Sequence, residues 1–280
     1  MIAFSIWPVH IYRYGIMYLL GFAFGYLGFR YIAKKKYFEI KFPRIQNVLE
    51  YHLENFLIVL FLGVLIGGRL GHVIIYNFPY YLAHPAEIIA FRSGGMSFIG
   101  GLFGVAIGIL AFRKSKKWHV RDLLVLFDII LVLLPIGIAF GRLGNYLNQE
   151  LYGILVSDWL PRLGYPLFSF LQSINIFHVY PAVDSFLRLN TNWLALFFEG
   201  LVTFVIGLFV FRHQIRRKLW HPWLWSAIFL WRYSFVRFIL EYFRADSQLE
   251  YRGRFTISQW FFIAFFVLAC LLLRKTWRKK

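Results

Sequence analysis

Residues 123–153 read LLVLFDIILVLLPIGIAFGRLGNYLNQELYG, an apolar run followed by a polar, glycine-rich segment. About 20 predominantly apolar residues are enough to cross the hydrocarbon core of a bilayer, so the first part predicts most of a transmembrane helix. The second part carries a cation, an anion and two side-chain amides: Arg142, Glu150, Asn145 and Asn148. A charge at the centre of a transmembrane helix costs about 2.5–3.5 kcal/mol, and residues kept there are usually functional. The segment therefore predicts a binding site, with a structural ion pair between spans as the alternative.

The composition indicates a membrane protein. Hydrophobic residues make up 60% of the chain and charged residues only 16%, and the mean hydropathy is +0.60. A soluble chain of 280 residues could not bury so much apolar surface. We expect an all-α polytopic membrane protein with seven transmembrane helices, at about residues 14–32, 54–76, 96–112, 122–141, 193–211, 222–243 and 257–273.

The net charge of +18 is concentrated in connections between these ranges. Basic clusters follow the first, third, fifth and seventh ranges: Lys34–Lys36, Lys41 and Arg44; Arg113, Lys114, Lys116, Lys117 and Arg121; Arg212 and Arg216–Lys218; Arg274, Lys275 and Arg278–Lys280. Alternate connections are basic, as the positive-inside rule requires. We therefore expect an outer N-terminus, a cytoplasmic C-terminus and no nucleic-acid partner.

We expect one transmembrane domain, residues 1–280, that includes a small outer cap or lid at 151–192. Residues 1–13 are aromatic and too short to cross a bilayer, so an outer interfacial segment is expected there. Cys270 is the only cysteine, and no Cys/His spacing typical of a metal site is present. We expect neither a disulfide framework nor a bound metal.

Glycines recur at helical spacing. Two sets lie four residues apart, Gly63, Gly67 and Gly71 in one and Gly100, Gly104 and Gly108 in the other, as do Gly137 and Gly141. Such spacing lines one helix face and favours close helix packing. The paired glycines Gly94-Gly95 and Gly100-Gly101, with Ser97 between them, instead suggest a re-entrant turn whose backbone amides face a cavity.

The sixth range carries a second polar constellation. Tyr233, Arg237, Glu241 and Arg244 are spaced four, four and three residues apart, so they share one helical face. Arg237 can pair with Glu241, and a purely structural ionic network is one interpretation. The other is an anion site, in which Arg237 and Arg142 clamp a phosphate or a phospholipid headgroup through bidentate hydrogen bonds. Arg69 supplies a third cation within the membrane.

At this point the residues resemble a known family, the prolipoprotein diacylglyceryl transferases of bacterial inner membranes. The similarity runs along most of the chain. It is carried, in order, by Tyr14–Tyr18 (YGIMY), Gly67–Gly71 (GGRLG), Gly94–Phe98 (GGMSF), Gly141–Gly153 and Arg237–Ile239 (RFI). The resemblance implies seven spans, an outer N-terminus and an outer cap, in agreement with the topology above.

The resemblance also implies a reaction. Members transfer the diacylglyceryl group of phosphatidylglycerol to the lipobox cysteine of a prolipoprotein signal peptide, and glycerol phosphate leaves. No organic cofactor or metal is implied. The implied catalytic residues are Arg142, Arg237, Tyr233, Tyr14 and Glu150. The implied lipid-binding residues are Arg142, Asn145, Asn148, Gly153, Arg69, Arg237, Glu241, Arg244, Gly94, Gly95 and Ser97.

Two departures from the family pattern concern the reaction itself. Ile99 stands where the family usually has a histidine, the proposed base for the thiol, and isoleucine cannot accept a proton. His72 is a candidate substitute, as are Tyr233 and Glu150. Residues 189–195 (LNTNWLA) replace a family box that typically reads HPSQLYE.

Three functions therefore remain open. The first is an active transferase with an altered thiol-activation step. The second is a paralogue that binds anionic phospholipid without transfer or that uses another acceptor. The third is a transporter whose buried arginines line a path, although the chain lacks the internal symmetry common in transporters.

Overall fold

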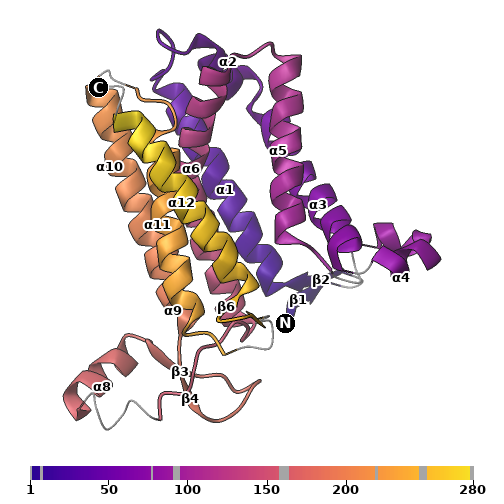
Figure 1. The fold of residues 1–280 in the computed structure, drawn as a ribbon, viewed down its shortest axis with the longest axis vertical. Coiled ribbons are helices and arrows are strands. Elements are labelled where there is room, and N and C mark those ends of the chain that lie inside the picture. Colours follow the sequence, from indigo (N-terminus) through magenta and orange to yellow (C-terminus); the bar gives the residue numbers. More distant parts are fainter. Residues whose placement is uncertain are drawn as a thin grey trace. The chain divides into compact units, whose positions relative to one another are not determined.

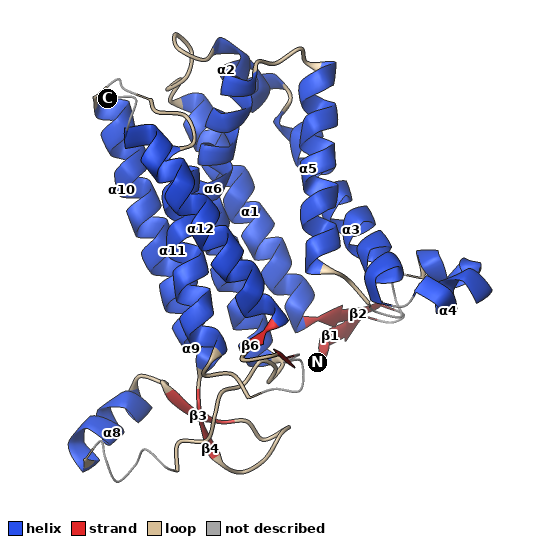
Figure 2. Ribbon diagram, in the orientation of Figure 1, coloured by secondary structure: helices blue, strands red, loops and turns tan. Residues whose placement is uncertain are grey.

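The computed structural model describes residues 2–6, 9–76, 78–90, 95–157, 164–217, 220–245 and 251–277. It is mostly helical, as expected (Figures 1 and 2). The chain divides into two compact units, residues 1–28 with 125–280 and residues 29–124. We call them the first and the second unit and describe each separately.

The first unit is a helical bundle. Its helices are α1 (Arg13–Lys34) and α6 (Val120–Leu147), which both continue into the second unit, and α9 (Thr191–Ala195), η3 (Leu196–Leu201), α10 (Val202–Arg216), α11 (Leu224–Glu241) and α12 (Ile257–Trp277). The three elements α9, η3 and α10 follow one another without a break and form one span, Thr191–Arg216. Within this unit α11 packs along α12 and also contacts α10.

Five helices in the described part of the chain are long and apolar enough to cross a membrane: Arg13–Lys34, Leu53–Ile75, Val120–Leu147, Thr191–Arg216 and Ile257–Arg274. The two remaining expected ranges are also helical, as α5 (Phe98–Ser115) and α11, but they are not among these five spans. Helix α11 carries three charged side chains, Arg232, Arg237 and Glu241. The protein is thus a polytopic membrane protein.

The second unit contains α2 (Pro43–Tyr51), α3 (Leu53–Tyr76), α4 (Phe78–Ala83), η1 (Pro85–Ile89) and α5. Helices α3 and α5 pack together through glycines. A Cβ atom built on Gly67 would lie 2.4 Å from the carbonyl oxygen of Gly100, and one on Gly104 would lie 2.1 Å from that of Gly63. The expected close packing is confirmed here. At Gly137 and Gly141 an added Cβ would itself meet nothing within 4 Å, but one on Gly21 of α1 would lie 3.4 Å from the Cα atom of Gly137.

The expected re-entrant turn is wrong for the second glycine pair, because Gly100 and Gly101 lie inside α5. Ser97 begins this helix: its side chain accepts a hydrogen bond from the Gly100 amide at 3.1 Å. Gly95 has a positive φ of 78°, which glycine adopts without strain. Gly94 lies outside the described residues.

In the described part of the chain, three short antiparallel strand pairs qualify the all-α expectation. They are β1 (Ile2–Ile6) with β2 (Val9–Tyr12), β3 (Phe177–Val179) with β4 (Leu187–Leu189), and β5 (Tyr251–Arg252) with β6 (Phe255–Thr256). The first pair falls in the expected interfacial segment, where β-branched and aromatic residues favour strands.

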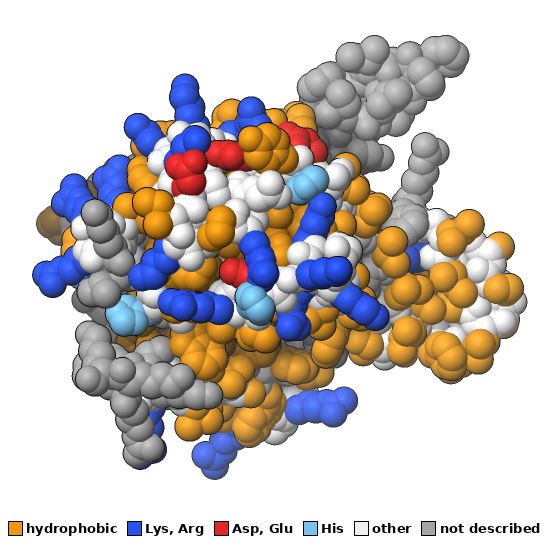
Figure 3. Space-filling view, turned by 90° about the horizontal axis from the view of Figure 1, so that it is seen from above, with side chains coloured by type: hydrophobic (Ala, Val, Ile, Leu, Met, Phe, Trp, Pro, Cys, Tyr) orange, Lys and Arg blue, Asp and Glu red, His pale blue; other side chains and the backbone are white. Residues whose placement is uncertain are grey.

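The expected cap, residues 151–192, has a small core of its own. Helix α8 (Tyr165–Ser173) and the β3–β4 pair surround buried Val156, Phe177 and Leu189. In the first unit the cap lies at the end opposite the basic C-terminal ends of α10 and α12 (Figure 1). Figure 3 views the molecule from above, and the charged side chains on that face are mostly Lys and Arg.

Candidate active site

The site begins with Arg142 near the C-terminal end of α6. The Nε and Nη2 atoms of its guanidinium both donate to Oε2 of Glu199, at 3.2 and 3.0 Å. Glu199 lies in η3, on the next long span of the first unit. Arg142 is therefore paired with a carboxylate that was not among the residues predicted from the sequence.

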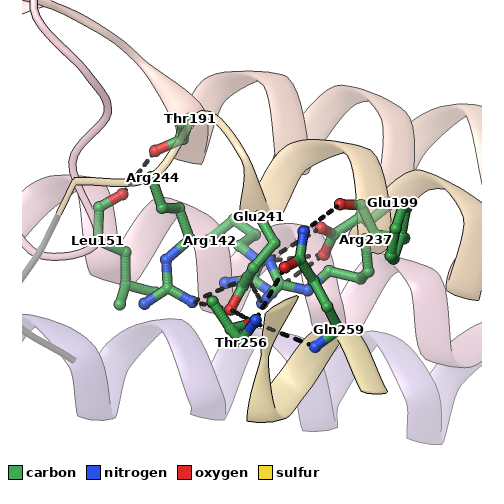
Figure 4. A network of polar contacts seen from close by, with 10 residues as sticks. Arg142, Leu151, Thr191, Glu199, Arg237, Glu241, Arg244, Thr256 and Gln259 are labelled. Atoms are coloured by element: carbon green, nitrogen blue, oxygen red, sulfur yellow. Dashed lines mark hydrogen bonds and ion pairs between the residues drawn. The ribbon is translucent and has the colours of Figure 1, made fainter. Parts of the chain in front are cut away.

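The pairing continues through three further side chains (Figure 4). Arg237 of α11 donates from Nη1 to Oε1 of Glu199 at 3.5 Å and from Nη2 to Oε2 of Glu241 at 3.0 Å. Arg244 donates from Nη1 to both oxygens of Glu241, at 3.2 and 3.0 Å. Arginines and glutamates thus alternate in one network, Arg142–Glu199–Arg237–Glu241–Arg244, which we call the arginine–glutamate network.

Both carboxylates of this network are buried. The Glu199 side chain is 0% exposed and that of Glu241 is 1% exposed, whereas the three arginine side chains keep 9–15%. A buried carboxylate is tolerated only when it is paired and hydrogen-bonded. Three guanidinium groups and two carboxylates leave the network with a formal charge of +1, so it can still attract an anion.

Helix α12 supports the network through a capping box. The Thr256 hydroxyl accepts from the Gln259 amide at 3.1 Å, and the Gln259 side chain accepts from the Thr256 amide at 2.9 Å. The Thr256 hydroxyl is also 3.5 Å from Oε1 of Glu241, and the Gln259 side chain donates to the Phe238 carbonyl on α11 at 3.3 Å. The start of α12 therefore positions Glu241.

A small cavity opens against the network. Its lining residues are Arg142, Leu151, Thr191, Asn192, Ala195, Arg237, Leu240 and Arg244. All three arginines of the network thus reach one cavity, together with apolar side chains. Guanidinium groups beside apolar side chains suit a ligand with an anionic headgroup and an apolar tail.

Two side chains of the segment 189–195, Thr191 and Asn192, connect the cap to this cavity. The Thr191 hydroxyl donates to the Leu151 carbonyl, and the Asn192 amide donates to the Glu150 carbonyl, both at 2.6 Å. They hold the backbone that follows α6. Thr191 and Asn192 thus place polar groups of the 189–195 segment at the cavity.

The other predicted site residues between positions 145 and 153 lie in the same unit. Asn145 is buried, and its carbonyl accepts from the Glu150 amide at 2.9 Å. The Asn148 side chain donates to Oε1 of exposed Glu150 at 3.3 Å. Gly153 packs between chain segments: an added Cβ would lie 2.3 Å from the Leu189 carbonyl oxygen and 2.9 Å from that of Phe243. The glycine is required by this close approach.

Both predicted tyrosines lie near Arg142. The Tyr14 ring packs on α6 at Gly144, where an added Cβ would meet it at 2.7 Å, and Tyr14 interacts electrostatically with Arg142 and Glu150. Tyr233 interacts with Arg142, Arg237 and Glu199. Its ring stacks on Phe229 at 5.5 Å between centroids.

The other predicted lipid-binding residues lie in the second unit. The guanidinium of Arg69 donates to three backbone carbonyls, of Glu87 at 2.6 Å, Ile88 at 2.8 Å and Gly95 at 3.2 Å. These bonds fold the connection before α5 onto α3. Ser97 caps α5. The role of Arg69, Gly95 and Ser97 in lipid binding stays a prediction.

His72, the candidate substitute base, packs against the same connection. An added Cβ on Gly95 would lie 2.4 Å from its Nε2 atom, so the glycine makes room for the imidazole. Its ring is 6.1 Å from that of Tyr81. The described geometry gives His72 a packing environment.

Sequence reasoning missed Glu199, Thr256 and Gln259. Glu199 was detectable as a charged residue inside an apolar range. Thr256 and Gln259 follow the Thr-x-x-Gln pattern of a capping box ahead of an apolar run. What the sequence did not contain was the pairing between residues 142 and 199, which are far apart in the chain.

Fold and site together define a polytopic membrane protein with a buried arginine–glutamate network beside an amphiphilic cavity. Residues 1–274 match the family model described as prolipoprotein diacylglyceryl transferase, and the chain belongs to this family.

Its relatives include three proteins named phosphatidylglycerol–prolipoprotein diacylglyceryl transferase. That of Rickettsia bellii (strain OSU 85-389) is 35% identical over 253 residues, covering 89% of this chain and 84% of the relative. That of Bordetella avium (strain 197N) is 35% identical over 281 residues, covering 99% and 95%. That of Chromobacterium violaceum is 31% identical over 289 residues, covering 100% and 96%.

Proposed function

We propose that this chain transfers the diacylglyceryl group of phosphatidylglycerol to the lipobox cysteine of prolipoproteins, with Arg142 and Arg237 holding the lipid phosphate. Family membership supports the reaction. The observation that supports the site is that guanidinium groups from α6 and α11 meet at Glu199 and line one cavity.

The reaction is a displacement at a glyceryl carbon. The cysteine sulfur forms a bond to that carbon, the bond from carbon to the phosphate oxygen breaks, and glycerol phosphate leaves with the electron pair. Negative charge grows on the phosphate as this bond breaks. Arg142 and Arg237 stabilise that charge in a site that excludes water, where such interactions are strongest.

The neighbouring residues orient the lipid. Arg244 provides a third cation at the cavity, and Glu241 keeps it and Arg237 in place. Tyr14 and Tyr233 lie beside Arg142, close to the reacting centre. Asn145, Asn148 and Glu150 shape the headgroup pocket, while Gly153 holds the cap against the end of α11.

Position 99 carries isoleucine instead of the histidine that the family resemblance implies, so the thiol is activated in another way. Loss of a general base costs about 10²–10⁴-fold. Cations lower the pKa of a nearby thiol, so the arginines provide part of the activation. The substrate sulfur enters as a thiolate beside the network.

The chain has seven spans in a bacterial inner membrane, with an outer N-terminus and a cytoplasmic C-terminus. Five spans meet the length and apolarity criterion, and α5 and α11 supply the other two. In the first unit, the basic ends of α10 and α12 and the opposite position of the cap support this orientation (Figure 1). The network then lies towards the outer leaflet, where prolipoproteins present their lipobox.

Complementation tests this function. Cells depleted of their own transferase receive this chain, and growth with formation of the thioether on a lipobox peptide is expected. Arg142→Ala and Arg237→Ala should abolish both. Binding of phosphatidylglycerol without any thioether would support the paralogue, and flux of a phosphorylated solute in proteoliposomes would support a transporter. Near-normal transfer by either alanine variant would refute the phosphate clamp.

A further inference from the structure

Among the described residues, Glu199 is the one acidic group with ion pairs to both arginines assigned to the phosphate. Its two oxygens are divided between them: Oε2 accepts from Arg142 and Oε1 from Arg237. Because its side chain is 0% exposed, water does not compete for these contacts. One carboxylate therefore determines how far apart the two guanidinium groups lie.

The backbone around Glu199 has unusual geometry. Residues Leu196–Leu201 form a π-helix within an otherwise α-helical span. Such segments are rare and frequently occur at functional sites. The wider turn accommodates one extra residue, and one residue corresponds to a rotation of about 100° around an α-helix. The π-helix thus sets the direction in which Glu199 points.

Side chains from two elements stabilise this π-helix. The carbonyl of Phe198 accepts from the Thr203 hydroxyl at 2.9 Å and from Nη1 of Arg232 at 2.7 Å. Arg232 also donates to the Thr203 hydroxyl. A backbone carbonyl without a donor costs several kcal/mol inside a membrane, so these donors make the segment tolerable in a membrane span.

Gly200 brings the same segment against α6. A Cβ atom on Gly200 would lie 2.6 Å from the Cβ of Ala139 and 3.2 Å from the carbonyl oxygen of Pro135. Ala139 and Arg142 are three residues apart on α6 and so share a face. Close contact at Gly200 therefore places Glu199 beside Arg142.

We propose that Glu199 is a positioning residue, which the π-helix holds between Arg142 and Arg237 so that both guanidinium groups face the lipid phosphate, and which limits the charge of the site so that glycerol phosphate leaves. This inference rests on the proposed function. With Glu199 ionised the network has a formal charge of +1, which matches a phosphodiester. Without that carboxylate the charge is +2, which favours the more highly charged glycerol phosphate product.

A merely structural ion pair would have other consequences. Replacing both partners of a buried ion pair is often tolerated, whereas removing only one of them destabilises the fold. In that case Glu199→Gln would change the folded fraction, while its kinetic constants for phosphatidylglycerol and its inhibition by the product would stay as they are. A positioning and charge-limiting role instead affects turnover and product binding in opposite directions.

The test compares Glu199→Gln, Glu199→Asp and Asp128→Asn with the unchanged full-length chain in defined vesicles. Asp128 is a matched control: it is a second buried carboxylate of the first unit, and it accepts from the amide and hydroxyl of Ser226 at 2.8 and 2.6 Å, outside the network. The assay measures kcat and KM for phosphatidylglycerol and the inhibition constant of glycerol phosphate.

For Glu199→Gln we expect kcat to fall about 10²-fold, as for loss of a preorganised electrostatic contact. We expect KM to stay equal or fall, and glycerol phosphate to inhibit about tenfold more strongly or more, because the site gains a positive charge. Glu199→Asp keeps the charge, so we expect a lower kcat with unchanged product inhibition. Asp128→Asn should leave all three constants unchanged.

The inference is overturned if glycerol phosphate inhibits Glu199→Gln no more strongly than the unchanged chain, or if the kcat of this variant is unaffected. If Glu199→Gln does not fold, Glu199→Asp and Gly200→Ala decide: both should lower kcat at unchanged product inhibition, and unaltered kcat in both would overturn the inference. Arg142→Ala is measured in parallel. Activity in that variant would refute the proposed phosphate site itself, whereas its inactivity beside a kinetically normal Glu199→Gln would refute only the role of Glu199.

Discussion

The two units of the chain each bury arginine in a different way. In the second unit Arg69 is 2% exposed and donates to the carbonyls of Glu87, Ile88 and Gly95. In the first unit Arg142 and Arg237 pair with carboxylate side chains and line a cavity. The residue type and the membrane setting are the same, but the acceptors differ.

The acceptors indicate what each cation does. Carbonyl groups are neutral and belong to the backbone, so Arg69 stabilises a local chain path. Carboxylates are charged and belong to side chains, so the network can exchange one of its contacts for a phosphate oxygen at little structural cost. We therefore expect Arg69 to act mainly in folding, and Arg142 and Arg237 to act in the reaction.

The largest expected effect separates these assignments by a change from arginine to lysine. Arg142→Lys and Arg237→Lys keep the charge but lose the planar, bidentate donor pattern. We expect transfer to fall by about 10²–10³-fold, or about 3–4 kcal/mol of transition-state stabilisation, at a nearly unchanged thermal midpoint. Initial rates on a lipobox peptide and unfolding in detergent provide the two measurements.

The control for this pair is Arg44→Lys. Arg44 is in the second unit, and its side chain is 45% exposed beside Asp122. It should keep both rate and stability. Normal rates in the two network variants would mean that the arginines are structural and would remove the contrast with Arg69.

The next effect concerns Arg69 itself. Arg69→Met removes the donors from three carbonyls, and we expect the free energy of unfolding to fall by about 2–3 kcal/mol. The rate per folded molecule should stay close to normal. Thermal unfolding and active-site-normalised rates measure the two quantities, with Arg44→Met as control. A stable but inactive variant would instead place Arg69 in the lipid site, as the sequence analysis expected.

The sequence predicts the features of this site that depend on local spacing or on hydropathy. All seven apolar ranges are helical, because a long apolar run in a membrane must satisfy its own backbone. The pairing of Arg237 with Glu241 follows from their spacing of four residues on α11. Both features involve residues close together in the chain.

Features that depend on distant contacts were not predictable. Glu199 meets Arg142 only because a π-helix and the contact at Gly200 turn it towards α6, and no local pattern reveals that register. Likewise Arg69 binds main-chain carbonyls, and every residue has one, so its partners carry no sequence signal. The N-terminal strand pair β1–β2 was not predicted, because strands of four or five residues give only a weak pattern in the sequence.

A smaller effect is expected from Gly153→Ala. The added Cβ would overlap the Leu189 and Phe243 carbonyl oxygens, both of them backbone atoms, so the cap must shift from the end of α11. We expect a loss of about 1–2 kcal/mol in the free energy of unfolding, as for other overpacked sites. Gly141→Ala is the matched control, because its Cβ would meet nothing within 4 Å.

Unfolding in detergent and rates per folded molecule again distinguish the interpretations of Gly153. If Gly153→Ala proves as stable as Gly141→Ala yet inactive, the glycine contacts the lipid and its role is not packing. Reduced stability at a normal rate per folded molecule would confirm that it joins the cap to the network.

The smallest expected effect is a pH dependence of the cap, which sets it apart from the permanently charged network. Burial lowers the pKa of the His178 imidazole. The Asn175 side chain donates to the Tyr146 hydroxyl at 3.2 Å, which leaves that hydroxyl free to donate to Nδ1 of His178 at 3.4 Å and so favours the neutral ring. The unfolded chain then binds a proton at a higher pH than the folded cap does.

The neutral His178 ring therefore contributes its full stabilisation of the cap above about pH 6.5, the ordinary pKa of histidine. That contribution is lost as the pH falls from there towards the lowered pKa of the folded state. Because the ring is partly exposed, we expect a loss below about 1 kcal/mol. Amide exchange in β3 and β4 between pH 7.5 and 5.5 measures it. His178→Gln should remove the acid-sensitive part, and His84→Gln, at an exposed site of the second unit, should not. Equal acid sensitivity in both variants would mean that another group in the cap titrates, and that the neutral His178 ring does not contribute to cap stability.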